Sequence, residues 1–166
     1  RNIHTITWNI KSEIQTQSYR FGQVIDVPVA TCAGYTFVGW DMTPPATMPD
    51  RSLTITAQWK EASYTVTLNG NGGTDAGTVT VTYNSEYPVL PDSSRTGYTF
   101  AGWFTEAENG TQIRQGDAVT ITQNSTLYAH WTANSYNVSF DLNGATGTAP
   151  GSITVTYDGT YEGLPE

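Results

Sequence analysis

The 166-residue sequence predicts a mainly β protein built from tandem copies of one small unit. Three observations carry this prediction. Threonine, whose branched Cβ suits a pleated sheet, supplies about one residue in six. Several segments alternate apolar and polar residues with the two-residue period of a half-buried strand. Long stretches of the sequence also return at a nearly constant offset, which is the mark of a repeat array.

The repeats define the expected boundaries. The motif Gly-Tyr-Thr-Phe-x-Gly-Trp occupies Gly34–Trp40 and returns at Gly97–Trp103. We therefore expect a first copy at 1–60, a second at 61–132 and the first half of a third at 133–166. The links between copies are only a few residues long, which restricts the orientations that neighbouring copies can take.

The second copy is the fullest, and we expect five extended segments in it. They cover residues 64–69, 78–83, 98–104, 111–114 and 126–131. The Gly- and Asn-rich stretch 70–73 predicts a turn, because both residues tolerate positive φ. The best helical candidate in the whole chain is 12–17, and it is short. The expected core residues of the second copy are Val66, Leu68, Val79, Val81, Phe100 and Leu127.

The third copy contains only a first hairpin, which needs support. A lone two-stranded hairpin is marginally stable in water, and unpaired strand edges recruit other chains. The side chains that need covering are Val138, Phe140, Ile153 and Val155. We expect this hairpin to self-associate with another chain or, as the weaker alternative, to pack on the second copy.

Composition excludes several classes of protein. A net charge of −8 argues against a nucleic-acid partner, because phosphates require Lys and Arg. No run approaches the roughly 18 apolar residues of a membrane span, and no secretion leader opens the sequence, so any leader is expected outside it. The single Cys32 forms no internal disulfide and no multi-cysteine metal site. We expect it to be a semi-buried structural thiol.

Chemically versatile side chains are scattered along the chain. His4 and His130 lie in different predicted strands and are expected at the surface, since a metal site needs several convergent ligands. Glu106, Glu108 and Asp117 fall in a loop that the first copy lacks. A solvated loop is the expected state of these carboxylates, with a weak cation site as the lesser alternative. We expect no catalytic, metal or cofactor site, and the sequence leaves any ligand-binding residues open.

The recurring tryptophans are assigned to packing. Trp40 corresponds to Trp103, and Trp59 corresponds to Trp131. A small domain has few large side chains with which to fill a core, so core packing is favoured over sugar stacking. Tyrosines are better candidates for exposure than these tryptophans. The candidates are Tyr87, Tyr128 and Tyr161.

The order of these motifs in 64–131 resembles the Listeria–Bacteroides repeat, the internalin-type B-repeat. The first copy matches in its motif and closing strand, and the third matches in its first half. This resemblance implies tandem small β-grasp-like domains, here two complete and one truncated. It also implies strings of repeats on secreted or wall-attached bacterial proteins, with spacer, adhesion or interaction roles.

These features favour a non-enzymatic extracellular array that forms a stalk or an adhesion and protein-interaction segment of a larger bacterial surface protein. Its partner would be a host or bacterial surface protein or a glycan. The alternative is a carbohydrate-binding accessory module of a secreted enzyme. An enzyme is the weakest class, because the copies share no nucleophile–base pair or ligand cluster.

Overall fold

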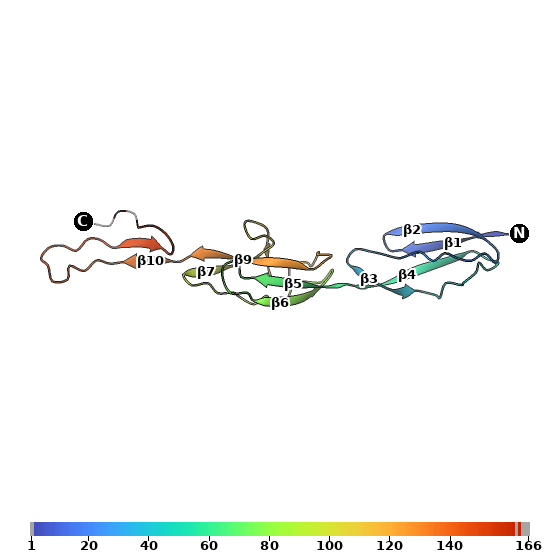
Figure 1. Cartoon of the computed structure of the whole chain (residues 1–166), viewed down its shortest axis with the longest axis horizontal. Coiled ribbons are helices and arrows are strands. Elements are labelled where there is room, and N and C mark those ends of the chain that lie inside the picture. The colour runs from blue at the N-terminus through green and yellow to red at the C-terminus, as the bar shows by residue number, and fades with distance from the viewer. Residues whose placement is uncertain (1, 162, 164–166) are drawn as a thin grey trace. The chain divides into compact units, whose positions relative to one another are not determined.

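A computed structural model describes residues 2–161 and 163, which form eleven β-strands and no helix (Figure 1). No helix that could cross a membrane is therefore found in this part of the chain. The chain divides into two compact units. The first unit comprises Arg1–Thr65, Thr80–Glu86 and Ala118–Asn124, and the second comprises Val66–Val79, Tyr87–Asp117 and Ser125–Glu166.

The first sheet has four strands in the order β2-β1-β4-β3. These are β1 (Ile3–Ile10), β2 (Glu13–Arg20), β3 (Tyr35–Trp40) and β4 (Leu53–Glu61). β1 runs antiparallel to β2 and parallel to β4. The opening and closing strands of this copy therefore lie side by side and parallel. The helical candidate 12–17 is wrong, since this segment lies mostly in β2, where sheet pairing outweighs its weak helical pattern.

The second sheet has the same arrangement of four strands plus a fifth, in the order β6-β5-β9-β7-β8. They are β5 (Ser63–Asn69), β6 (Gly77–Thr82), β7 (Tyr98–Phe104), β8 (Gln112–Ile113) and β9 (Ser125–Ala133). All five predicted extended segments are confirmed. β5 and β9 are parallel, with Leu68 opposite Leu127. The mixed β fold is thus confirmed, whereas the β-grasp label stays a prediction.

The third sheet is a hairpin of β10 (Ser135–Val138) and β11 (Ile153–Thr156), which pair antiparallel. Its four apolar side chains are half-buried: Val138, Phe140, Ile153 and Val155. Association with another chain through this hairpin stays a prediction, as do the copy boundaries 1–60, 61–132 and 133–166.

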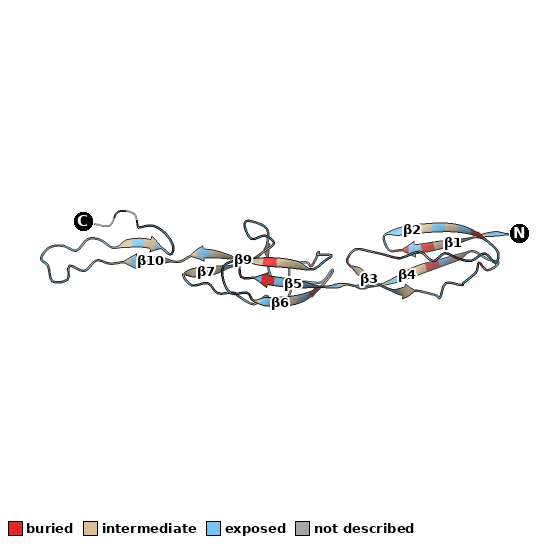
Figure 2. Cartoon of the chain, viewed as in Figure 1, coloured by how far each residue is buried: buried red, intermediate tan, exposed pale blue. Residues whose placement is uncertain are grey.

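Each large sheet buries alternate side chains of its central strands, which appear as short buried stretches in Figure 2. In the first sheet Ile6, Trp8 and Ile55 are fully buried. In the second, the expected core residues Val66, Leu68, Val81 and Leu127 are buried. Val79 and Phe100 are only half-buried, so their assignment to the core is wrong. The physical reason is that β6 is an edge strand and that no helix among the described residues covers β7.

Of the four tryptophans assigned to core packing, only Trp103 is buried, whereas Trp40, Trp59 and Trp131 are half-buried, so the prediction is confirmed for Trp103 alone. Trp103 is buried, and Phe100 lies between it and Trp131 at ring-centre distances of 5.3 and 5.5 Å. Tyr161 is exposed as expected and Tyr128 is half-buried. Tyr87 is only 4% exposed, so the prediction for it is wrong. Its backbone N–H donates to the Asp117 carbonyl, which holds the residue inward, and burial raises the pKa of its phenol.

Candidate functional site

The two histidines are half-buried and make structural contacts. His4 Nε2 lies 2.8 Å from Asp50 Oδ1. The His130 ring stacks on Phe104 at 3.9 Å, and its Nε2 lies 3.0 Å from the Glu106 carbonyl oxygen. Residues 2–161 and 163 contain no group of three or more His, Cys, Asp or Glu side chains that could hold a metal ion.

The thiol and the loop carboxylates are also placed by the structure. Cys32 is half-buried, as expected, and its Sγ lies 3.9 Å from the Ala33 carbonyl oxygen. Glu106 and Glu108 are exposed in the loop after β7, which confirms the solvated state. Asp117 instead accepts a hydrogen bond of 2.7 Å from the Arg114 backbone N–H and closes a turn.

Sequence reasoning missed a contact that occurs once in each unit. In the first unit the ring of Tyr83 covers Gly34, where an added Cβ would lie 2.6 Å from the ring. In the second unit the ring of Tyr157 covers Gly97 in the same way, at 2.3 Å. Both glycines have φ of +79°, so conformation and close approach both require glycine there. We call this Tyr-on-Gly arrangement the junction contact.

Each junction contact is reinforced by an aromatic pair and by two backbone hydrogen bonds. The Tyr83 ring meets the edge of Tyr35 at 5.3 Å, and the Tyr157 ring meets Tyr98 at 5.5 Å. The backbone of a linker residue bridges the two partners. The bonds are Ala62 N–H to Gly34 O at 2.9 Å, Tyr83 N–H to Ala62 O at 2.9 Å, Asn134 N–H to Gly97 O at 2.9 Å and Tyr157 N–H to Asn134 O at 2.8 Å. The sequence signal for this contact was a Tyr that recurs directly after the second strand of the second copy and of the third copy.

A cation also lies over the tyrosine of each motif, but the two cations come from different segments of their copies. Lys11, in the turn after β1, puts Nζ 3.6 Å from the ring centre of Tyr35. Arg95, in the loop before β7, puts Cζ 3.9 Å from the ring centre of Tyr98. Both distances suit a cation–π interaction.

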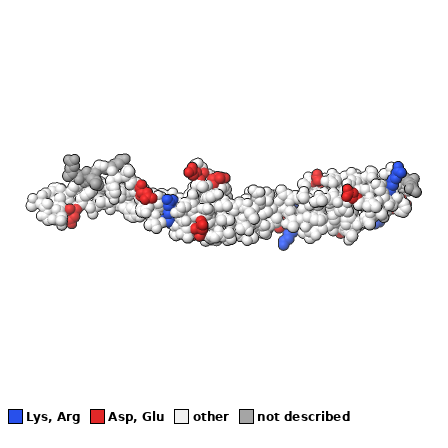
Figure 3. Space-filling model, viewed as in Figure 1, with Lys and Arg blue, Asp and Glu red and all other residues white. Residues whose placement is uncertain are grey.

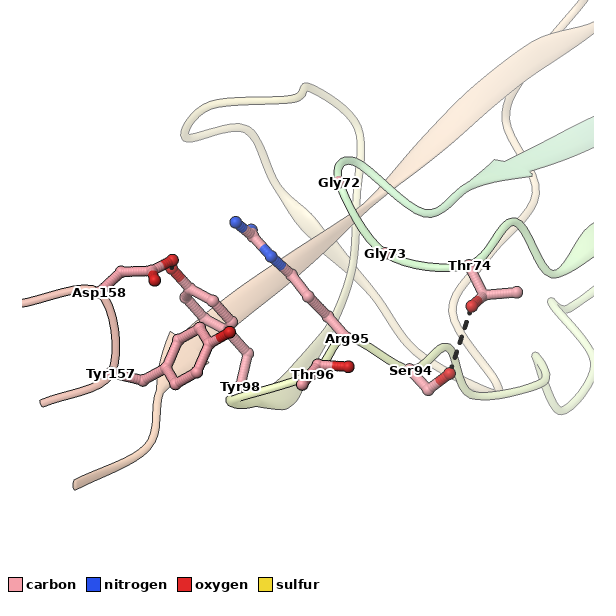
Figure 4. A pocket seen from close by; sticks show the side chains of 9 residues that line it. All are labelled: Gly72, Gly73, Thr74, Ser94, Arg95, Thr96, Tyr98, Tyr157 and Asp158. Carbon is pink, nitrogen blue, oxygen red and sulfur yellow. Dashed lines mark hydrogen bonds between the residues drawn. The ribbon is translucent and has the colours of Figure 1, made fainter. Parts of the chain in front are cut away.

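Around Arg95 the second unit has a cavity of about 560 Å³, which we call the Arg95 pocket (Figure 4). Its lining residues are Gly72, Gly73, Thr74, Ser94, Arg95, Thr96, Tyr98, Tyr157 and Asp158. The Tyr98 hydroxyl donates to Asp158 Oδ2 at 3.1 Å, and this bond raises the pKa of the Tyr98 phenol. At the other end, the hydroxyls of Thr74 and Ser94 lie 3.3 Å apart.

Arg95 is the only basic side chain that lines this pocket. Within the described part of the chain, no carboxylate lies within ion-pair distance of its guanidinium group, and that group makes no hydrogen bond. Basic side chains are scarce in the sequence, at 7 against 15 acidic ones, and few of them are visible on the face that Figure 3 shows. The pocket therefore combines a free guanidinium group, two tyrosine rings and several hydroxyls.

A family model of the Listeria-Bacteroides repeat domain matches residues 4–58 and 64–130. The chain is 33% identical over 143 residues to "Internalin H" of Listeria monocytogenes, covering 79% of this chain and 25% of that protein. It is 30% identical over 156 residues to a protein of Evansella cellulosilytica named "Putative membrane protein", covering 86% of this chain and 23% of that protein. The chain thus spans about a quarter of the length of these relatives. It belongs to the Listeria-Bacteroides repeat domain family.

Proposed function

We propose that this chain is a non-catalytic segment of a larger bacterial surface protein and acts there as a stalk or spacer outside the cell. Two repeats of one family in a single chain support this role. So do the names of the two relatives, "Internalin H" and "Putative membrane protein". The activity of the whole protein resides in parts that these repeats separate from the cell surface.

The junction contact is the observation that carries the proposal. A spacer made of independent domains on flexible links would lose reach through conformational freedom. Here Tyr83 packs on Gly34 and Tyr35, and Tyr157 packs on Gly97 and Tyr98, with the linker backbone hydrogen-bonded in between. The same contact at both positions is suited to an array that grows by adding copies.

A non-catalytic role also agrees with how the reactive side chains are used. His4 pairs with Asp50, and His130 stacks on Phe104. The Cys32 Sγ lies 3.9 Å from the Ala33 carbonyl oxygen. None of these contacts joins a nucleophile to a base, which is the arrangement that nucleophilic catalysis requires.

Adhesion, or carbohydrate binding as an accessory module of a secreted enzyme, is the second candidate function. The Arg95 pocket is the observation that favours it, because its tyrosines and hydroxyls line a cavity of ligand size. This function is compatible with a spacer, since a repeat can both extend and bind.

The spacer role is tested by replacing residues 1–166 of the parent protein with a Gly/Ser linker of equal length. Access of an antibody to a tag on the cell-distal side is then measured on intact cells. The proposal predicts lower access and faster proteolysis with the linker. Equal access, or turnover of a substrate by the purified chain, would contradict it.

A further inference from the structure

We propose that the Arg95 pocket binds an acidic sugar unit, with the carboxylate on Arg95 and the ring beside the tyrosines. This inference rests on the second candidate function, carbohydrate binding, and is independent of the spacer role. The proposed binding site has three parts, all within the second unit: a charged hydrogen-bond donor without a partner, an aromatic wall and a set of hydroxyl groups.

The donor is preorganised. Arg95 is half-buried and is held over the Tyr98 ring, with Cζ 3.9 Å from the ring centre. Gly72 lies against its other side, since a Cβ on Gly72 would be 3.4 Å from Arg95 Cζ and Nη1. A guanidinium group binds a carboxylate through two parallel hydrogen bonds, and fixing it in advance lowers the entropic cost. Figure 4 shows this side chain extending among the pocket residues with no partner drawn to it.

The wall and the hydroxyl partners suit a saccharide. Tyr157 keeps 36% of its surface exposed, so part of its ring faces solvent beside Tyr98. The C–H face of a pyranose ring is apolar enough to lie on such a surface. Asp158 is exposed and would accept from sugar hydroxyls, as would the hydroxyls of Thr74 and Ser94.

The room available also fits an oligosaccharide. The Arg95 pocket of about 560 Å³ lies in the usual range of roughly 300–1,000 Å³ for ligand sites. Arg95 and Tyr98 line a second hollow of about 290 Å³, together with Asn109, His130 and Trp131. Sugars on either side of an acidic unit would therefore find polar and aromatic groups.

Charge favours a sugar over an acidic peptide. Asp158 lines the Arg95 pocket and Glu108 lines the second hollow, so each of the two hollows that Arg95 lines also has a carboxylate. A peptide with adjacent carboxylates would be repelled by them, whereas in a chain of alternating acidic and neutral sugars the charges are separated by neutral units.

The first copy lacks this combination. Cys32 occupies the position that Arg95 has in the second copy, two residues before the motif. The cation over Tyr35 comes from Lys11 instead, which lies in the tight turn between β1 and β2, where the second copy has its glycine-rich turn 70–73. Lys11→Gln is therefore a matched control, because it removes one cation from an equivalent tyrosine and changes net charge equally.

The test is an NMR titration of the whole chain with a tetrasaccharide in which glucuronate alternates with N-acetylglucosamine. Shifts are expected for the amides of residues 72–74 and 94–98. Arg95→Gln should weaken binding by roughly 10-fold or more, as for a lost charge-assisted pair. Arg95→Lys should weaken binding less, since the charge remains but the planar group that forms two parallel hydrogen bonds is lost. Lys11→Gln should leave affinity unchanged, and raising the salt concentration should reduce it.

Two further ligands separate the alternatives. A neutral tetramer of N-acetylglucosamine should bind much more weakly, and so should the peptide Gly-Glu-Glu-Gly, whose carboxylates are adjacent. Equal binding of the neutral tetramer, tighter binding of the peptide, or absence of shifts in a folded wild-type chain would each overturn the proposal. Equal losses in Arg95→Gln and Lys11→Gln would overturn the assignment to this pocket.

Discussion

The closing-strand tryptophans of the two copies occupy equivalent positions but differ in whether their indole N–H donates a hydrogen bond. Trp131 Nε1 donates to the Gly70 carbonyl at 3.0 Å. Trp59 Nε1 is buried, and no partner is found for it among the described residues. A shared motif therefore fixes the place of the ring, whereas the turn after the first strand decides whether its polar atom is satisfied.

The turns explain the difference. In the second copy Gly73 lies against the Trp131 ring, where a Cβ would be 2.4 Å from Cζ2. In the first copy the turn is tight and Ile10 is buried with Ala30 and Ala57, against which Trp59 packs. One copy thus uses a glycine turn and a hydrogen bond where the other uses an aliphatic side chain.

The largest effect is expected from truncating Trp8, which corresponds to Leu68 of the second copy. Trp8 is fully buried, lies 4.9 Å from Trp40 and donates to Gln17. Trp8→Ala should lower the free energy of unfolding of the first unit by about 3–5 kcal/mol, because it leaves a large cavity. Residue-resolved hydrogen exchange measures this unit separately. A loss below about 1 kcal/mol would show that this core does not depend on Trp8.

A smaller effect is expected from Gly73→Ala in the turn of the second copy. Its Cβ would meet both the Trp131 ring and the Ser94 carbonyl, so the turn must move. We expect a loss of about 1–3 kcal/mol and a change in tryptophan fluorescence. Gly151→Ala is the control, since no atom lies within 4 Å of its added Cβ. If Gly73→Ala and Gly151→Ala had the same stability and fluorescence, the proposed close packing of the turn against the Trp131 ring would be wrong.

The indole difference itself is tested by replacing each tryptophan with phenylalanine. Trp131→Phe removes a donor from Gly70, whereas Trp59→Phe removes a buried N–H without a partner. Trp59→Phe should therefore be the milder change, by about 1 kcal/mol in denaturant unfolding. A larger loss of stability in Trp59→Phe than in Trp131→Phe would show that the turn does not determine what the indole N–H contributes to stability.

The smallest effect concerns Asp50, whose pKa is lowered chiefly by its hydrogen bond with His4 and further by Asn2. A lowered pKa gives a stabilisation that is present above the ordinary value of 3.8 and is lost as the pH falls through the folded-state value. The stability difference between wild type and Asp50→Asn should thus be small near neutral pH and vanish on acidification. A difference that grew as the pH fell would contradict this linkage.

Sequence patterns sufficed for the local structure. Alternation and turn residues located all five strands of the second copy, whereas the pairing of β5 with β9 came from the structure. Burial was harder to predict. Tyr87 is drawn inward by a backbone bond to Asp117, which lies 30 residues away, and no local pattern reports such a contact.

The candidate site was not predictable for a similar reason. Arg95 and Tyr98 are neighbours in sequence, but Tyr157 and Asp158 reach them only through the third hairpin. Tyr83 and Tyr157 recur at matching positions in the sequence. The sequence alone does not show that each of them packs on a glycine of the preceding copy, Gly34 for Tyr83 and Gly97 for Tyr157.

Hydrogen exchange at the linker amides tests the junction contact most directly. The amides of Ala62 and Asn134 donate to the Gly34 and Gly97 carbonyls. Tyr83→Ala should increase exchange at Ala62 alone, and Tyr157→Ala should increase it at Asn134 alone, whereas the exposed Tyr161→Ala should change neither. If both amides kept their wild-type protection in the two junction variants, the tyrosines would not hold the linkers and the account of a contact-coupled array would fail.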